Sequence, residues 1–110
     1  MCLEGEILNE MRERMVKSFL DTIVLTKLRE QDSPMSGYDV ITFINKKFRM
    51  LVSSGNIYYL LYSMERDGLI KGRWSKRKRV YTLTEKGEKK IKAILEAKEK
   101  ILSLMASLFV

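Results

Sequence analysis

Apolar residues recur at three- and four-residue steps between residues 6 and 31, which is the spacing of one face of an α-helix. The sequence therefore predicts a helix, in one or two pieces, over residues 6–31. Pro34 cannot continue a helix and favours extended backbone at Ser33, so we expect the helix to end before this point.

A second and a third helix follow, and each begins at a serine that can cap its first turn. Ser36 precedes Asp39 by three residues, which is close to a capping box. Ser53 or Ser54 starts the third helix, whose apolar residues fall on one face. Gly68 is expected to end it, because glycine suits the left-handed geometry that follows a helix C-terminus.

Two short β-compatible stretches, residues 69–74 and 79–83, predict a hairpin, and Thr84 is expected to cap a final helix over 84–109. Four consecutive cations, Lys76 to Arg79, stand at the expected tip of the hairpin. Residues 69–92 hold ten cations and two anions, a net +8, so the remaining 86 residues carry 11 cations and 12 anions, a net −1. Such a local patch favours a phosphate-binding surface over an ordinary solvated face.

These features predict a fold that is mainly α with a small β-hairpin. The arrangement is a winged helix-turn-helix, with N- and C-terminal dimerisation helices. We expect a single domain over 1–110, composed of the N-terminal helix or helices at 6–31, the helix-turn-helix and wing at 36–83, and the C-terminal dimerisation helix at 84–109.

The final helix carries more apolar surface than a small domain can cover. Its apolar residues are close to heptad spacing, and a helix of about 25 residues is about 38 Å long. An intramolecular pairing of residues 6–19 with 91–109 would cover this surface, but its length favours a homodimer. The residues expected at the dimer contact are Ile7, Met11, Met15, Ile94, Leu95, Ile101, Leu102, Met105 and Leu108.

Scarce residue types argue against several classes of function. Histidine is absent, and with it the commonest general base and the commonest metal ligand, so we expect no enzyme, no metal site and no cofactor. Cys2 is the sole cysteine and cannot form an intrachain disulfide, which suits a cytoplasmic protein. The apolar residues 101–110 are too few to span a bilayer, which takes about 20, so no membrane partner is expected.

Three motifs lie in order along residues 20–90. They are Met35-Ser-Gly-Tyr-Asp-Val-Ile, then Ser54-Gly-Asn-Ile-Tyr-Tyr-Leu-Leu-Tyr-Ser-Met-Glu-Arg-Asp-Gly-Leu-Ile, then Arg79-Val-Tyr-Thr-Leu-Thr-Glu-Lys-Gly. In this order and spacing they resemble the PadR family of winged-helix transcriptional regulators, which has prolines at the positions of Ser54 and Tyr59. The resemblance implies a DNA-binding regulator whose wing cations reach phosphates or the minor groove.

The third helix is the expected reader of DNA. Asn56 is best suited to pair with an adenine edge, while Tyr58 and Tyr59 can equally hold phosphates or read bases. Trp74 is expected to pack at the base of the wing. The expected DNA contacts are Ser53, Ser54, Asn56, Tyr58, Tyr59, Ser63, Arg73, Lys76, Arg77, Lys78 and Arg79.

We interpret the chain as a sequence-specific regulator of transcription that binds double-stranded DNA, with repression as the favoured output. Its recognition helix would enter the major groove, and its basic wing would contact the backbone or the minor groove. The alternative is a winged-helix module that binds a protein and has only non-specific affinity for nucleic acid. A small-molecule effector, the operator sequence and the regulated genes are left open.

Overall fold

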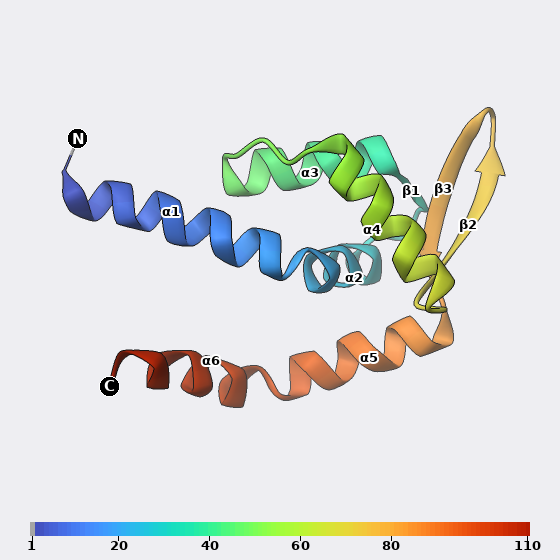
Figure 1. The fold of residues 1–110 in the computed structure, drawn as a ribbon. Coiled ribbons are helices and arrows are strands. Elements are labelled where there is room, and N and C mark those ends of the chain that lie inside the picture. The colour runs from blue at the N-terminus through green and yellow to red at the C-terminus, as the bar shows by residue number, and fades with distance from the viewer. Residues whose placement is uncertain (1) are drawn as a thin grey trace.

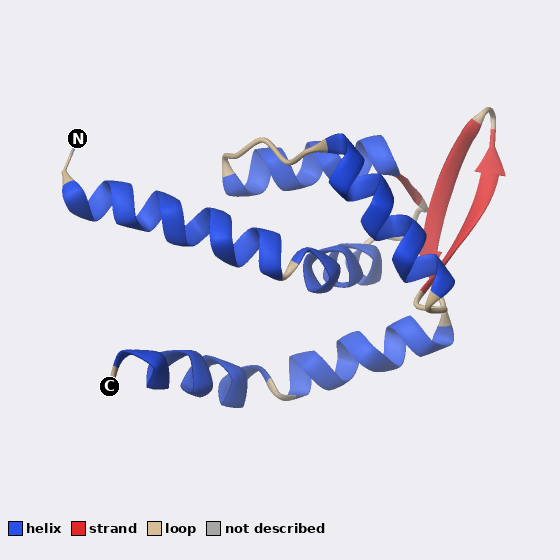
Figure 2. Ribbon diagram, in the orientation of Figure 1, coloured by secondary structure: helices blue, strands red, loops and turns tan. Residues whose placement is uncertain are grey.

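Six α-helices and three short strands make up residues 2–110, the part of the chain that this computed structural model describes. The packed body lies between the sheet and the termini, and α1 and α6 extend from it toward the same end (Figure 1). Figure 2 shows the hairpin of β2 and β3 at the opposite end from both termini. The elements are α1 (Leu3–Ser18), α2 (Leu20–Glu30), β1 (Met35–Ser36), α3 (Gly37–Phe48), α4 (Ser54–Arg66), β2 (Ile70–Ser75), β3 (Lys78–Leu83), α5 (Glu85–Glu96), α6 (Lys98–Ala106) and the 3-10 helix η1 (Ser107–Phe109).

The predicted caps of α3 and α4 are confirmed. The Ser36 hydroxyl accepts a hydrogen bond from the Asp39 amide at 3.1 Å, and the Ser36 amide donates to the Asp39 carboxylate at 3.0 Å. The Ser53 hydroxyl accepts from the amide of the third helical residue of α4 at 3.3 Å. After α4, Gly68 has a φ of +78°, and the Leu69 amide donates back to the Met64 carbonyl at 2.9 Å. Local chemistry thus fixes both helices of the helix-turn-helix.

The sheet has three antiparallel strands in the order β1-β3-β2, one more than the sequence predicts. The additional strand, β1, is two residues long and pairs Met35 with Tyr81 and Ser36 with Val80. Because β1 leads directly into α3, this pairing ties the start of α3 to the wing. In the hairpin itself, Ser75 pairs with Lys78, so the turn lies at residues 76–77.

Two interruptions divide the terminal helices. The predicted N-terminal helix is in two pieces, α1 and α2, separated at Phe19. The predicted continuous helix over 84–109 is wrong: α5 ends at Glu96, and the chain bends at Ala97 before α6. Ile91 holds α5 on the core, whereas α6 has no buried residue, so nothing in the core keeps α6 in line with α5.

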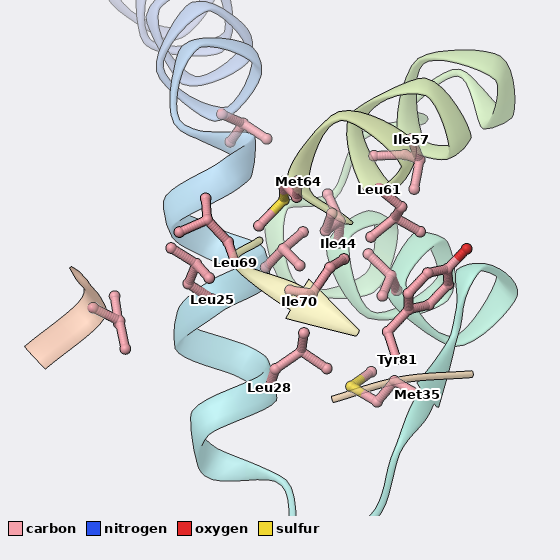
Figure 3. Close-up of a cluster of buried hydrophobic side chains, with 14 residues drawn as sticks. Leu25, Leu28, Met35, Ile44, Ile57, Leu61, Met64, Leu69, Ile70 and Tyr81 are labelled. Atoms are coloured by element: carbon pink, nitrogen blue, oxygen red, sulfur yellow. The ribbon is translucent and has the colours of Figure 1, made fainter. Parts of the chain in front are cut away.

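The core lies beneath α4 and is built from most of the elements. Leu25 of α2, Ile44 of α3, and Ile57 and Leu61 of α4 are fully buried, together with Ile70 of β2. Figure 3 shows these side chains in one cluster. Burying an aliphatic side chain of this size contributes about 1.5–3 kcal/mol to stability. One side of α4 is therefore anchored along its length, and the other side is left for solvent or a partner.

Candidate nucleic-acid interface

The outer side of α4 is rich in tyrosine. Tyr58, Tyr59 and Tyr62 are exposed, with 70% of Tyr59 and 64% of Tyr62 accessible to solvent. Tyr62 was not among the predicted DNA contacts, although it lies three residues after Tyr59 and so shares its side of the helix. Tyr38, in the first turn of α3, is also exposed and also stands outside the predicted DNA contacts. Phenol groups can both stack and form hydrogen bonds, so this surface can bind a polar, aromatic ligand.

Three of the predicted reading residues lie along the edge of this outer side that adjoins the α1–α2 junction. Asn56, Tyr59 and Ser63 line a crevice of 460 Å³, whose opposite wall is formed by Lys17 and Asp21 near the α1–α2 junction. Asn56 is exposed, and its side-chain amide forms no hydrogen bond within residues 2–110. The Asn56 side chain is therefore free to pair with an external group. Ser53 and Ser54, at the start of the same helix, are exposed.

A second hollow separates α4 from the wing. This groove, of 280 Å³, is lined by Tyr38, Tyr58, Arg77 and Lys78. The Tyr58 ring lies directly over Gly37, where an added Cβ would come within 2.3 Å of a ring carbon. Glycine at this position therefore lets α3 and α4 approach closely enough for Tyr58 to form one wall of the groove.

The tip of the wing is a tight turn made of cations. Lys76 and Arg77 have φ values of 49° and 69°, in the left-handed region that glycine and asparagine usually occupy in two-residue hairpins. Each such residue costs roughly 1 kcal/mol or more in backbone strain. Lys76, Arg77, Lys78 and Arg73 are all exposed, and none of the four forms an ion pair within the described residues. Their charges are available to an external anion.

Arg79, the last predicted wing contact, differs from its neighbours. It is half-buried, and its guanidinium group forms an ion pair with the Glu65 carboxylate at 2.6 Å.

The expected packing of Trp74 at the base of the wing is wrong, because 70% of this residue is exposed. Trp74 pairs with Arg79 across the hairpin, next to the pair that flanks the turn. At that position the strand has passed beyond the core, and the Arg79 guanidinium lies 6.0 Å from the indole centroid.

Most of the elements described above fall within one known protein family. The family model described as "Transcriptional regulator PadR-like family" matches residues 24–93, from within α2 through the wing and into α5. The chain belongs to the PadR-like family of transcriptional regulators. The predicted winged helix-turn-helix, mainly α with a small β-hairpin, and the predicted family are thereby confirmed, and the protein is a transcriptional regulator with a winged-helix fold.

Solved structures of PadR-like proteins and of another winged-helix protein are similar to this chain. A PadR-like transcriptional regulator from Bacillus cereus is 26% identical over 87% of this chain and 96% of its own, with a TM-score of 0.70. PadR from Bacillus subtilis, solved in complex with operator DNA, is 25% identical over 69% of this chain and 46% of its own, with a TM-score of 0.62. F93 from STIV, a winged-helix DNA-binding protein, is 29% identical over 73% of this chain and 87% of its own, with a TM-score of 0.64. No curated protein matches the sequence.

Outside the matched region, the helices of this PadR-like regulator expose much apolar surface. The intramolecular pairing of the two terminal helices does not cover it, because α6 buries no residue and α1 buries only Val16. Of the nine residues predicted at a dimer contact, Ile94 packs against the core, and Met11 and Met105 are half-buried. The other six are exposed: Ile7, Met15, Leu95, Ile101, Leu102 and Leu108. Further exposed apolar residues outside the predicted dimer contact are Leu3, Leu8, Phe19, Leu104, Phe109 and Val110.

Tyr81 lies where the core meets the groove beside the wing of this PadR-like regulator. Only 6% of Tyr81 is exposed, and its burial raises the pKa of the phenol above the ordinary value of 10.0, with the Arg79 charge opposing this shift. The phenol therefore stays protonated at neutral pH and can donate a hydrogen bond.

Within residues 2–110, no three cysteine, aspartate or glutamate side chains gather closely enough to hold a metal ion. No helix of the described chain combines the length and the apolar character needed to cross a bilayer.

Proposed function

We propose that this PadR-like regulator binds a specific sequence in double-stranded DNA. In this proposal α4 enters the major groove, while the hairpin of β2 and β3 contacts the backbone or the minor groove. The observation that carries it is the polar, tyrosine-rich outer side of α4, which stands beside the exposed and unpaired wing cations Lys76, Arg77 and Lys78. The operator complex of Bacillus subtilis PadR, a similar structure, supports the same partner.

The proposal includes a homodimer. The exposed apolar residues of α1, α5 and α6 lie on two arms that extend from the body toward the same end (Figure 1). Exposed apolar residues gathered in such number on two helical arms are typical of subunit interfaces. A two-fold dimer would present two recognition helices to two symmetric half-sites of DNA. We further propose that the dimer acts in the cytoplasm as a repressor, because a protein seated on promoter DNA obstructs polymerase.

Replacing Arg77 and Lys78 together by alanine tests the wing. Both are exposed and unpaired, so the double variant should keep its stability and lose affinity for all duplexes about equally. The slope of log affinity against log salt concentration should fall by roughly one for each phosphate that the variant no longer neutralises. Titrations of operator and random duplex at several salt concentrations measure this. Weaker binding at an unchanged slope would show that the wing does not hold phosphates.

Replacing Asn56 by alanine tests sequence reading. A bidentate pair between an asparagine side chain and adenine is worth about 1–3 kcal/mol of discrimination, so specific binding should fall by this amount while non-specific binding stays nearly constant. Stability should change little, because the helix cap uses the Asn56 backbone amide and the Ser53 hydroxyl rather than the Asn56 side chain.

The readouts for Asn56→Ala are the ratio of specific to random affinity and the melting temperature, measured on the same variant. An unchanged ratio with a lower melting temperature would give Asn56 a structural role. Equal affinity of the unmodified protein for all duplexes would instead favour the alternative function, a protein-binding module with only non-specific affinity for nucleic acid.

A further inference from the structure

The side chain of Arg79 crosses one strand of the wing to reach the recognition helix. Arg79 belongs to β3, the central strand, and β2 is the edge strand between β3 and the end of α4. The crossing point is Gly72. A Cβ added there would lie 2.7 Å from Arg79 Nε and 2.8 Å from Nη2, so any side chain at this position would collide with the guanidinium group. The crossing therefore depends on a glycine in the edge strand.

Glu65, in the last turn of α4, accepts hydrogen bonds from both strands of the wing. Its Oε2 atom accepts a hydrogen bond from Arg79 Nη2 at 2.6 Å and another from the Gly72 amide at 3.2 Å. The second bond satisfies an amide of the edge strand that has no further strand to pair with. The Glu65 and Arg79 side chains are 29% and 36% exposed, so water screens this pair less than the pairs on the open surface.

This pair differs from the other ion pairs of the described chain in what it joins. Arg66–Asp67 and Lys89–Glu85 link near neighbours and are mostly exposed, and Arg29–Glu88 joins α2 to α5 on the surface. Only the Glu65–Arg79 pair connects the two elements that the proposed function brings to DNA. It is also accompanied by a backbone hydrogen bond and by the nearby ring of Trp74.

We propose that Glu65 and Arg79 are positioning residues that lock the wing onto the recognition helix, so that α4 and the hairpin meet DNA as one rigid unit. The proposal rests on the proposed DNA-binding function. A wing held in place before binding loses less conformational freedom on the DNA, which strengthens binding without a new contact. Arg79 then acts through Glu65 and not through a phosphate, in contrast to the exposed cations of the tip.

The two roles of Arg79 predict different salt dependences. If Arg79 holds a phosphate, Arg79→Gln should lower the salt slope by roughly one, as for any residue that neutralises a phosphate. If Arg79 positions the wing, Arg79→Gln should weaken binding to the selected operator about tenfold at an unchanged slope. Glu65→Gln should weaken binding in the same way, although it removes a negative charge that would otherwise repel DNA.

Gly72→Ala blocks the path of the Arg79 side chain across β2 without changing any charge. Thr82→Ala is its control, since Thr82 lies on the opposite, exposed face of the same hairpin.

Trp74 is the single tryptophan of the chain and lies on the wing, so its fluorescence anisotropy reports wing motion in the absence of DNA. We expect lower anisotropy in Gly72→Ala and Glu65→Gln at a temperature where circular dichroism shows both to be folded. Thr82→Ala should match the unmodified protein. Arg79→Lys keeps the charge and serves as the second variant if Gly72→Ala does not fold.

Operator affinity and its salt slope are then measured on the same variants, with a duplex selected from a random pool by the unmodified protein. Unchanged anisotropy in these variants would overturn the lock, whatever the protein binds. Lower anisotropy with unchanged operator affinity would overturn its role in DNA binding. If the unmodified protein selects no duplex, the proposed function fails, while the anisotropy experiment still decides whether Glu65 and Arg79 fix the wing.

Discussion

Replacing Leu102 and Leu108 by glutamate is expected to convert the proposed dimer into monomers and to reduce the affinity for operator DNA by about a thousandfold. Both side chains belong to the apolar arm of α6 and η1, with 49% and 75% of their surfaces exposed. In a lone chain such positions already face water, so the new charges should not disturb its core. In a dimer they would be buried without partners, which costs several kcal/mol for each charge. A monomer holds only one half-site, and its affinity approaches the non-specific level.

Sedimentation equilibrium at micromolar concentration measures the dimer, and duplex titration measures the affinity. Leu51→Glu is the matched control, because Leu51 is a leucine that is 89% exposed and belongs to the loop between α3 and α4 rather than to either arm. It should remain a dimer. Removing residues 99–110 should expose the remaining arm and give aggregates or unfolded chain. A monomeric unmodified protein would contradict the proposed dimer.

Gly87→Ala is expected to destabilise the fold by about 3 kcal/mol, at the upper end of the usual cost of overpacking. Gly87 is buried in the first turn of α5, where an added Cβ would lie 2.0 Å from the Leu69 carbonyl oxygen. That oxygen is part of the backbone and also accepts a hydrogen bond from the Thr84 amide at 3.2 Å. It cannot move away without pulling the junction of the wing and α5 apart, so α5 must shift instead.

Gly55→Ala is the control for this prediction. Gly55 lies in the first turn of α4, and an added Cβ there would meet only the Ser53 hydroxyl, at 3.7 Å. Because alanine is a better helix former than glycine, this change should be neutral or stabilising by about 0.5–1 kcal/mol. Urea denaturation of both variants compares their free energies of unfolding. A similar loss of stability in the two variants would show that the close approach at Gly87 is not the cause.

The parts of the structure that depend on neighbours along the chain are predictable from the sequence. The Ser36 and Ser53 caps, the left-handed Gly68 and the hairpin all follow from residues at most a few positions apart, and all are confirmed. The PadR-like motifs are also local, and they indicated the family. Helical periodicity and the caps placed the outer bounds of the α1–α2 pair and the starts of α3, α4 and α5 within a few residues of those observed. They did not show the bend at Ala97, which depends on where the core ends, so the predicted end of the last helix is wrong.

The features that sequence reasoning missed depend on contacts between distant residues. β1 is two residues long and carries no pattern of its own, and only its pairing with β3 makes it a strand. In the sequence, Arg79 is one of four consecutive cations that look equivalent. In the fold, its side chain crosses β2 at Gly72 and reaches Glu65 at the end of α4. Trp74 is expected to pack at the base of the wing, but its position near the tip of the hairpin, away from the core, leaves it exposed. Which wing cations stay free for an external anion, and which one pairs within the protein, is therefore a property of the fold.

Selection of duplexes from a random pool by the unmodified protein, followed by nuclease protection of the enriched sequence, tests the central claim most directly. The proposed function predicts one enriched site with two-fold symmetry, protected over two half-sites whose centres lie about 10 base pairs apart or a multiple of this. A pool that remains random, with the same affinity for every duplex, would contradict sequence-specific binding.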